Sequence, residues 1–458
     1  MKNLNKKQAK RFTRSSKASA LITFGVLMLS GTESFATNGF FMHGYGTNDQ
    51  MAGAGSAHPQ DTLAAAANPA GMAWLGGTRM DVAGQLFVPL RGFDPSDNAI
   101  WDGMGKQESG RLYYLIPSLG FSYQMDELST IGWSVYGAGL GTKYWASHTW
   151  NDYEPGSVFY QSGAFFDGMA SIDLLIAINE FSYSRKVPEI NFKTDWGFGL
   201  KNVSFGYGAL LSMSAFKAEG LGLFSLVAFD KIPSERDFAM GNGYSAGVMG
   251  DIFDDVTLSI GYHSAINQQF KKYSGLFAGG GAFTIPERVN IGTSWKASNN
   301  FRVNFDYEFI KYSAARQIGN DFNQLTTFIP GTQEVIGFLG SLSGAGFGWE
   351  DSHVFKLGAE YKFSSLPKWT WRAGISHQDQ IVPKSEVLFN TLAPGVIEDH
   401  YAFGFTHQTT QQLDLSMQVF YAPREYVYGQ GKGINNFGEG VEIYLEEFGL
   451  EGKLGYKF

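Results

Sequence analysis

Apolar and polar side chains alternate in fourteen separate segments of the chain within residues 78–458. In the ninth segment, for example, Phe301, Phe305 and Phe309 share one face. An alternation of period two gives an extended strand one apolar face and one polar face, and a tilted strand of about 9–11 residues crosses a bilayer. The pattern therefore predicts an all-β protein, a 14-stranded antiparallel transmembrane β-barrel.

The connections between these segments alternate strictly between short and long. The short ones are residues 124–129, 185–195, 251–255, 296–300, 364–368 and 407–412. The long ones are residues 89–111, 142–170, 216–243, 267–287, 313–352, 378–400 and 422–447. Short periplasmic turns and long extracellular loops are typical of bacterial outer-membrane barrels, whereas a soluble β-sandwich gives no reason for the alternation. The fourth segment, residues 171–183, is apolar on both faces, so its register stays open.

The composition supports a membrane barrel. Charged residues make up 17% of the chain and aromatic residues 16%, whereas soluble domains carry about 25% charged residues. The net charge of −8 argues against nucleic acid as a partner. With no cysteine in the chain, thiolate metal sites and disulfides are excluded. We expect no cofactor and no metal ion, because the eight histidines show no ligand spacing.

The two ends of the chain carry targeting features. Residues 1–36 read as a signal peptide, with a basic start, an apolar run over residues 18–29 and the cleavage-like Ser34-Phe35-Ala36. The alternative is an uncleaved anchor, but the apolar run is shorter than the roughly 20 residues that a spanning helix needs. The terminal Phe458, on a strand of period two, resembles the signal read by the barrel-assembly machinery, which we expect as a partner during biogenesis.

Residues 37–77 are rich in Gly and Ala and end in Asn68-Pro69-Ala70-Gly71. They are neither strand-like nor polar enough for a tail, so we expect a compact hatch inside a barrel formed by residues 78–458. Charges of both signs on the opposite strand faces suggest a paired network that holds this hatch, since buried charges need partners. The alternative is the water-filled lumen of an open porin. These lumenal residues are Arg288, Asn290, Arg302, Asn304, Asp306, Glu308, Lys356, Glu360, Arg372, Asp414, Glu451 and Lys453.

Five short motifs stand out along the chain: Gly44-Tyr45-Gly46, Met51-Ala52-Gly53-Ala54-Gly55, Asn68-Pro69-Ala70-Gly71-Met72, Trp369-Thr370-Trp371-Arg372-Ala373-Gly374 and Pro394-Gly395. Together they resemble one known family, the outer-membrane long-chain fatty acid transporter (FadL) family. The resemblance covers the whole chain after the signal peptide. It implies passive uptake of a hydrophobic small molecule across the outer membrane, with lipid and lipopolysaccharide around the barrel. We expect long-chain fatty acids as cargo; the alternatives are aromatic hydrocarbons, carried by relatives, or a general porin.

The same resemblance implies a route. A ligand lands in a groove among the extracellular loops, moves to a pocket inside the barrel, and leaves sideways through a kink in the third strand when the hatch moves. Phe40, Phe41 and Met42 then project into the pocket, or else only anchor the hatch. Gly137, Gly139 and Gly141 share one face of the third strand, and strand glycines mark a bend or a close approach. A tight fit against the hatch is the alternative.

The loops supply the remaining ligand-binding candidates. The apolar run of residues 220–229 lies in a predicted outer loop, and exposed apolar patches mark binding sites; a packed loop helix is the alternative. Aromatic residues after the third strand wall a groove or belong to the outer aromatic girdle. A fatty acid also needs a cation for its carboxylate. The loop candidates are Trp145, Trp150, Leu221, Leu223, Phe224, Leu226 and Phe229, and the cations are Lys217, Lys311 and Arg316.

One motif points to an enzyme. Residues 243–247 match G-x-S-x-G, in which a hydrolase exposes its serine on a strand–turn–helix. Here Ser245 begins a short barrel strand and no helix follows, so we expect no hydrolase and no other enzyme.

Overall fold

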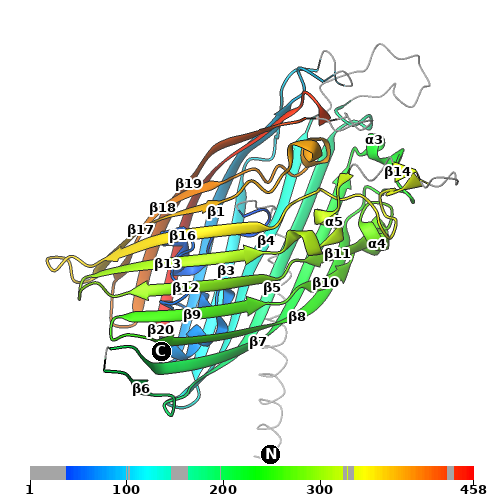
Figure 1. Ribbon diagram of the computed structural model, residues 1–458. Helices are drawn as coiled ribbons and strands as arrows, with labels where there is room; N and C mark the ends of the chain where they lie inside the picture. The colour runs from blue at the N-terminus through cyan, green and yellow to red at the C-terminus, as the bar shows by residue number, and fades with distance from the viewer. Residues whose placement is uncertain are drawn as a thin grey trace, which may run out of the picture.

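The computed structural model describes residues 38–98, 101, 104–145, 163–195, 197–322, 327–328, 335–430 and 438–458. The predicted signal peptide, residue 37 of the predicted hatch and Trp150 lie outside these residues. The chain folds into a closed barrel of fourteen antiparallel strands, confirming the predicted fold class (Figure 1). Each strand pairs with its neighbours in sequence, and β1 pairs with β20 to close the ring. The wall strands are β1 (Arg79–Asp94), β3 (Tyr114–Gln124), β4 (Ser129–Tyr144), β5 (Ala170–Lys186), β7 (Gly199–Glu219), β8 (Asp237–Asp251), β9 (Val256–His263), β12 (Arg288–Trp295), β13 (Phe301–Ile310), β16 (Ser352–Tyr361), β17 (Trp369–Gln378), β18 (Asp399–Gln408), β19 (Leu413–Tyr428) and β20 (Glu442–Lys457).

The remaining elements are short. Six strand pieces lie in the connections: β2 (Gln107–Glu108), β6 (Phe192–Lys193), β10 (Ile266–Gln269), β11 (Ala282–Ile285), β14 (Thr327–Phe328) and β15 (Val335–Ile336). The α-helical turns are α2 (Met72–Leu75), α3 (Gly222–Ser225), α4 (Ala278–Gly281), α5 (Arg316–Gly319) and α6 (Val387–Asn390). The 3₁₀ turns are η1 (Gly46–Met51), η2 (Ala64–Ala66), η3 (Pro69–Gly71), η5 (Lys271–Tyr273), η6 (Tyr312–Ala314) and η8 (Lys384–Glu386). Within the described ranges, no helix is long and apolar enough to cross a membrane.

The period-two pattern in the sequence becomes the two faces of the wall. In β1, Met80, Val82 and Leu86 point outward and are exposed, while Asp81 and Gln85 are buried in the lumen. Stacked aromatic side chains, such as Trp369 and Trp371 against Phe403 and Phe405, continue on the outer face of β17 and β18. Such outward aromatic residues are typical of the interface girdles of membrane barrels.

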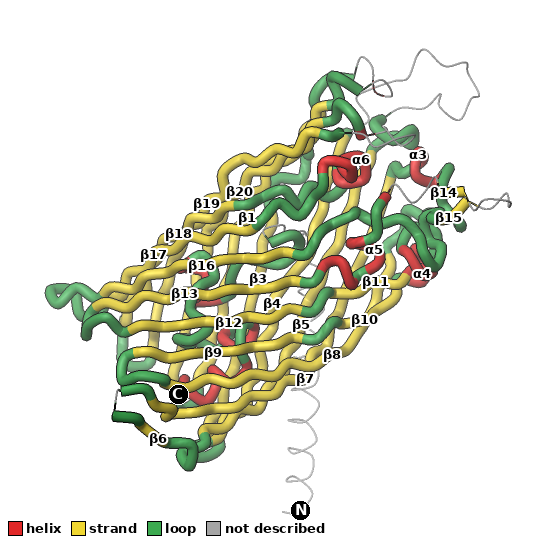
Figure 2. Tube along the Cα trace, viewed as in Figure 1, coloured by secondary structure: helices red, strands yellow, loops and turns green. Residues whose placement is uncertain are grey.

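Short turns and long loops gather at opposite ends, as predicted (Figure 2). Several strands are longer than the sequence pattern indicated. β7 and β8 shorten the predicted loop 216–243 to residues 220–236, and β19 extends to Tyr428. The added residues lie beyond the expected strand ends, where the alternation of side chains no longer marks a strand. The fourth strand, β5, is buried on both faces from Ala170 to Glu180, which explains its ambiguous pattern.

Residues 38–77, which we call the lumenal segment, lie inside the ring of strands (Figure 1, blue). The segment contains η1, η2, η3 and α2, and these turns pack against β4, β5, β7, β8, β16, β17, β18 and β19. The apolar core lies between the lumenal segment and the end of the barrel that carries the long loops. Polar and charged contacts surround the other sides of the lumenal segment.

Candidate functional site

An apolar cavity lies at the long-loop end of the barrel; the empty space between its lining residues, including space open to solvent, is about 470 Å³. Strands β4, β5 and β7 contribute to its wall, and the folded-in loops close it. Every lining side chain is apolar: Phe40, Leu140, Ile172, Leu174, Phe216, Leu221, Leu276, Phe277, Phe283, Ile318, Phe347, Trp349, Phe389 and Leu392. Such a lining excludes water and accepts hydrocarbon.

The three predicted residues near the start of the lumenal segment, Phe40, Phe41 and Met42, have different neighbours. Phe40 lines the cavity and packs on the rings of Tyr312 and Trp349, with centroid distances of 5.7 and 6.4 Å. Phe41 lies beside the Arg288 guanidinium, 5.1 Å from its ring centroid. Met42 packs in a different apolar cluster, which includes Phe87.

The apolar loop 220–229 contains both buried and exposed side chains. Leu221 and Phe224 are buried, Leu223 packs against the core, and the short helix α3 carries Leu223 and Phe224. Leu226 and Phe229 are exposed. The loop therefore combines both predicted interpretations, a packed helix and an exposed apolar patch. Trp145 is exposed beside Lys143 and does not line the cavity.

None of the three predicted cations lines the cavity. Lys217 pairs with Glu219 at 2.6 Å, and Lys311 pairs with Glu287 at 3.1 Å. Arg316 donates to the carbonyl of Leu342 at 3.3 Å on the outer surface.

Arg91 on β1 is a buried cation beside this cavity. It lines a smaller cavity of about 220 Å³ together with Thr142, and Leu140 and Trp349 line both cavities. Its Nη2 donates to the Tyr114 hydroxyl at 2.5 Å, while its Nε is buried without a hydrogen-bond partner in the described structure. The sequence contained one signal that we missed: Arg91 lies an even number of residues from Asp81 and Gln85 on the same strand, so it faces the lumen as they do.

The hydrogen-bond ladder between β3 and β4 is incomplete. It runs from Gln124↔Thr130 to Leu119↔Val135 and then stops, although β4 continues to Tyr144. On its other edge, β4 pairs with β5 along its whole length and without a register shift. The second half of β4, after Val135, therefore has no backbone pairing with β3. We call its unpaired side the free edge of β4.

The lumenal segment contacts this free edge. Phe41 forms an isolated antiparallel bridge with Ala138, and the Gly139 N–H donates to the Phe40 carbonyl at 2.9 Å. The Tyr45 hydroxyl donates to the Gly137 carbonyl at 2.8 Å. Gly141 lines the Arg91 cavity. The three glycines thus lie where the free edge meets the lumenal segment and the cavity.

The Asn68-Pro69-Ala70 motif packs against glycines of the wall. Asn68 Nδ2 donates to the Val248 carbonyl at 3.1 Å and to the Ser259 hydroxyl at 2.9 Å, and its Oδ1 caps the Ala70 N–H at 2.9 Å. A Cβ on Gly247 would collide with Asn68, and a Cβ on Gly206 would collide with Pro69 and Ala70. The close approach is possible only because these wall residues lack side chains.

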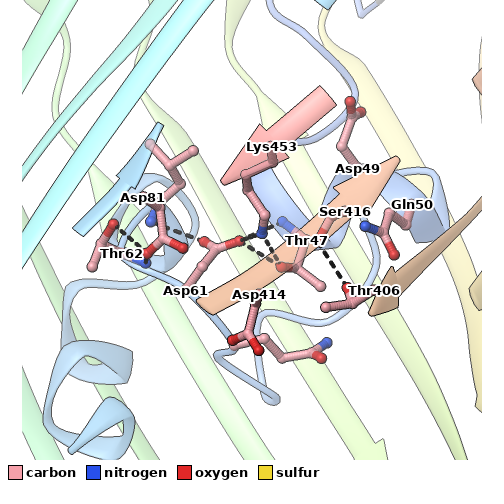
Figure 3. Close-up of polar contacts among 12 residues, drawn as sticks. Thr47, Asp49, Gln50, Asp61, Thr62, Asp81, Thr406, Asp414, Ser416 and Lys453 are labelled. Carbon is pink, nitrogen blue, oxygen red and sulfur yellow. Dashed lines mark hydrogen bonds and ion pairs between the residues drawn. The ribbon is translucent and has the colours of Figure 1, made fainter. Parts of the chain in front are cut away.

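Charged side chains tie the lumenal segment to the wall, as predicted. Lys356 donates to Glu308 at 2.6 Å and to the His43 carbonyl at 2.8 Å. Asp306 accepts from the N–H of Ser56 at 2.9 Å. At the other end, Lys453 contacts both Asp61 and Thr47 (Figure 3). Of the twelve predicted lumenal residues, all but Arg302 and Asp414 are buried.

The G-x-S-x-G serine does not form a hydrolase triad. Ser245 Oγ donates to Glu180 at 2.6 Å, and Glu180 in turn lies 3.3 Å from His263 Nε2. A nucleophilic serine needs the histidine as its direct base, whereas here the carboxylate lies between them. Among the described residues, no group of His, Asp and Glu side chains is arranged to hold a metal ion.

The sequence did not identify most of the cavity lining. Ile318, Phe347, Trp349, Phe389 and Leu392 come from the long loops after β13 and β17. Strand periodicity ends before these loops, so the sequence contains no signal that they fold back into the lumen.

A sealed barrel with an apolar internal cavity and a charged lumenal segment defines a class of outer-membrane channel for hydrophobic compounds. The sequence matches a family described as outer membrane protein transport protein (OMPP1/FadL/TodX) over residues 29–427. The chain belongs to this family, which consists of transport channels rather than enzymes. It is an outer-membrane β-barrel that transports hydrophobic compounds.

Solved structures share the fold. The Pseudomonas putida toluene transporter TodX is 15% identical, with a TM-score of 0.60 over 92% of this chain and 100% of TodX. The Ralstonia pickettii toluene transporter TbuX is 14% identical, with a TM-score of 0.58 over 91% of this chain and 99% of TbuX. A Pseudomonas aeruginosa FadL homologue is 15% identical, with a TM-score of 0.59 over 94% of this chain and 100% of the homologue. No curated protein matches the sequence.

Proposed function

We propose that this chain takes up long-chain fatty acids by passive diffusion, with the hydrocarbon tail in the apolar cavity and the carboxylate at Arg91. One observation carries the choice of cargo. Arg91 is buried, forms no ion pair among the described residues, and lines a cavity that shares Leu140 and Trp349 with the apolar cavity. A buried guanidinium that donates to the neutral Tyr114 hydroxyl rather than to a carboxylate is poorly compensated, and a ligand carboxylate offsets that cost.

Glu447 sets a condition on this binding mode. It lies on the lumenal face of β20, two residues after Leu445, which pairs with Arg91. Both its carboxyl oxygens are buried without hydrogen-bond partners in the described structure, and His400 Nε2 lies 3.8 Å from one of them. A protonated Glu447 donates to the ligand carboxylate, whereas an ionised one repels it. The two groups together favour an acidic head group that shares a proton with the site.

The exit route follows the edge of β4. Phe40 and Phe41 close the space between the apolar cavity and the unpaired half of β4. Movement of the lumenal segment, in the role of a hatch, breaks the bridge to Ala138 and leads the ligand sideways into the membrane. Exposed Leu226 and Phe229 provide an apolar surface on which a ligand lands. The energy comes from the gradient and from the membrane's affinity for the ligand, since apolar surface leaves water favourably.

The second candidate cargo is an uncharged aromatic hydrocarbon. The wholly apolar lining favours it, and two relatives in fold are toluene transporters. Oleate and toluene binding to the purified, detergent-solubilised protein, measured by the fluorescence of Trp349 and the other tryptophans, separates the two. We expect saturable oleate binding that toluene does not displace.

The test of the head-group site is Arg91→Gln. A charge-assisted hydrogen bond contributes about 1.5–3 kcal/mol, so we expect oleate affinity to fall about tenfold or more while toluene binding stays unchanged. Lys217→Gln and Lys311→Gln are the matched controls, because both lysines lie outside the cavity and should leave oleate binding intact. Toluene binding without oleate binding would make aromatic hydrocarbons the cargo, and binding of neither would refute the pocket.

A further inference from the structure

A second cavity lies at the short-turn end of the barrel, on the far side of the lumenal segment from the apolar cavity. It encloses about 780 Å³ of space, including its open mouth. Its walls come from β1, β17–β20 and the lumenal segment, and the turn that connects β16 to β17 lies at its rim. Its lining is polar and contains a single carboxylate, that of Asp414. Its basic residues are Arg79, Lys362, Lys368, Arg372, Lys453 and Lys457.

The six basic side chains contact only four carboxylates. Arg79 pairs with Asp81 at 2.8 Å and shares Asp414 with Lys457, at 3.3 and 3.8 Å. Of the other two carboxylates, Asp61 contacts Lys453, and Glu360 contacts Arg372 at 2.9 Å and His58 at 3.7 Å. Two of the six basic side chains therefore form no ion pair with a carboxylate among the described residues.

The lysines that carry this excess lie at the rim. Lys362 and Lys368, at the two ends of the turn after β16, are exposed and form no ion pair within the described part of the chain. Exposed lysines alone do not make a site, because water solvates them. The floor of the cavity supplies the second observation.

The floor presents hydrogen-bond donors to the cavity. Gln60 accepts from Arg372 Nη2 at 2.5 Å, but its own Nε2 is buried without an acceptor in the described structure. Thr406 and Ser416 share a hydrogen bond of 2.9 Å, and Figure 3 shows the two hydroxyls beside each other, near Lys453. An unused buried donor is expensive, so the Gln60 amide is available to an acceptor in the cavity.

We propose that this cavity, the periplasmic basic site, binds a phosphate group. A phosphate monoester carries a charge of about −1.5 to −2 at pH 7 and three acceptor oxygens. That charge matches the two unpaired positive charges, and the oxygens match the Gln60 amide and the hydroxyls. The occupant is inorganic phosphate or the head group of a phosphomonoester lipid, which share this chemistry. Because Thr47 and Gln60 belong to the lumenal segment, the bound group bridges that segment to the wall.

The test is calorimetric titration of the purified full-length protein in non-ionic detergent at low ionic strength. We expect inorganic phosphate to bind saturably with one site per chain, and acetate, with one negative charge, to bind at least tenfold more weakly. The variant Lys362→Gln/Lys368→Gln removes two exposed charges without touching the buried network, so it should fold and lose at least tenfold in phosphate affinity.

The control is Lys193→Gln/Lys201→Gln. These lysines are also exposed at the short-turn end, but both pair with Asp254, at 2.8 and 2.7 Å, and lie outside the cavity. Phosphate binding in this variant should equal that of the wild type. Monomeric dihexanoyl phosphatidic acid is the second probe; if it binds with the same variant dependence and phosphate does not, the occupant is a lipid head group. Binding of neither probe, equal losses in both lysine variants, or acetate binding as tight as phosphate would overturn the proposal.

Discussion

At the scale of single residues, the interior of this barrel depends on charges that would be costly alone. Lys453 and Asp61 are both buried and contact each other across the boundary between wall and lumenal segment (Figure 3). Thr47 adds hydrogen bonds to the Asp61 carboxylate, one of them from its N–H at 2.6 Å. The pair therefore positions the lumenal segment rather than supplying large net stability, since desolvation offsets much of the attraction.

Removing one member of this pair should loosen the segment. Asp61→Asn leaves Lys453 buried and uncompensated, and breaking a buried pair costs about 3–5 kcal/mol. We expect faster proteolysis of residues 38–77 in the folded barrel, measured by limited trypsin digestion and mass spectrometry. The double variant Asp61→Asn/Lys453→Met removes both charges and should be digested more slowly than the single variant. Equal digestion of wild type and Asp61→Asn would show that the pair does not hold the segment.

Glycines of the wall give a second prediction at this scale. Gly247→Ala places a methyl group against Asn68, and overpacking typically costs about 1–3 kcal/mol. The midpoint of thermal unfolding, followed by circular dichroism, should fall. Gly452→Ala on β20 is the control, because no atom lies within 4 Å of its added Cβ; it should leave the midpoint unchanged or raise it by restricting the unfolded chain. A midpoint that falls equally in both variants would contradict the packing argument.

At the scale of elements, β4 departs most from a regular wall strand. Its residues from Ser134 to Thr142 are buried on both faces. The free half of β4 has lost β3 as a partner and gained Phe40 and Phe41 instead. The lumenal segment completes hydrogen bonds at this strand edge, so the hatch movement proposed above would open the edge.

A disulfide tests this element directly. Phe41 and Ala138 form an antiparallel bridge, and such pairs have Cα atoms about 4.5–5.5 Å apart, within the range that a disulfide spans. The chain has no cysteine of its own. We expect Phe41→Cys/Ala138→Cys to stop oleate uptake by cells when oxidised and to recover it on reduction.

The control for this crosslink lies on the outer wall. Val82 and Leu454 are paired residues of β1 and β20 that point outward. The disulfide in Val82→Cys/Leu454→Cys crosslinks two strands that have no part in the route, so uptake should be insensitive to reductant. Uptake through the oxidised Phe41–Ala138 variant at the wild-type rate would exclude movement at this bridge.

At the scale of the whole molecule, the barrel consists of three layers along its axis. The long-loop end holds the apolar cavity, the middle holds the charged contacts of the lumenal segment, and the short-turn end holds the basic cavity. A hydrophobic ligand can dissolve in the first layer but not in the other two. Straight passage to the periplasm is therefore unfavourable, which supports the lateral route proposed above.

The layered lumen predicts how the protein conducts ions. In planar bilayers we expect little steady current from the full chain, because residues 38–77 fill the lumen. Deletion of these residues should give stable channels of high conductance if the barrel still folds, which its circular dichroism spectrum would show. A large steady current from the full chain would favour the general porin.

The sequence by itself determined the class of fold. Period-two alternation and the alternating lengths of the connections follow from local chain geometry and from the need of each strand to face lipid on one side, so they are readable without contacts. The lumenal charges were readable for the same reason, and Arg91 had the correct parity although it was not selected. The resemblance of the Asn68-Pro69-Ala70 motif was also visible, but its contact with Gly206 and Gly247 was not.

Only the tertiary structure decided the site. The cavity combines several loops between Leu221 and Leu392 with three strands and Phe40, and no local pattern encodes such long-range contacts. The predicted cations Lys217, Lys311 and Arg316 had suitable chemistry, yet they lie outside the cavity. Their position along the barrel axis could be predicted from the sequence, but whether each side chain faces the cavity could not. The free edge of β4 likewise depends on where its pairing with β3 ends, and the residues of β4 alone do not specify that.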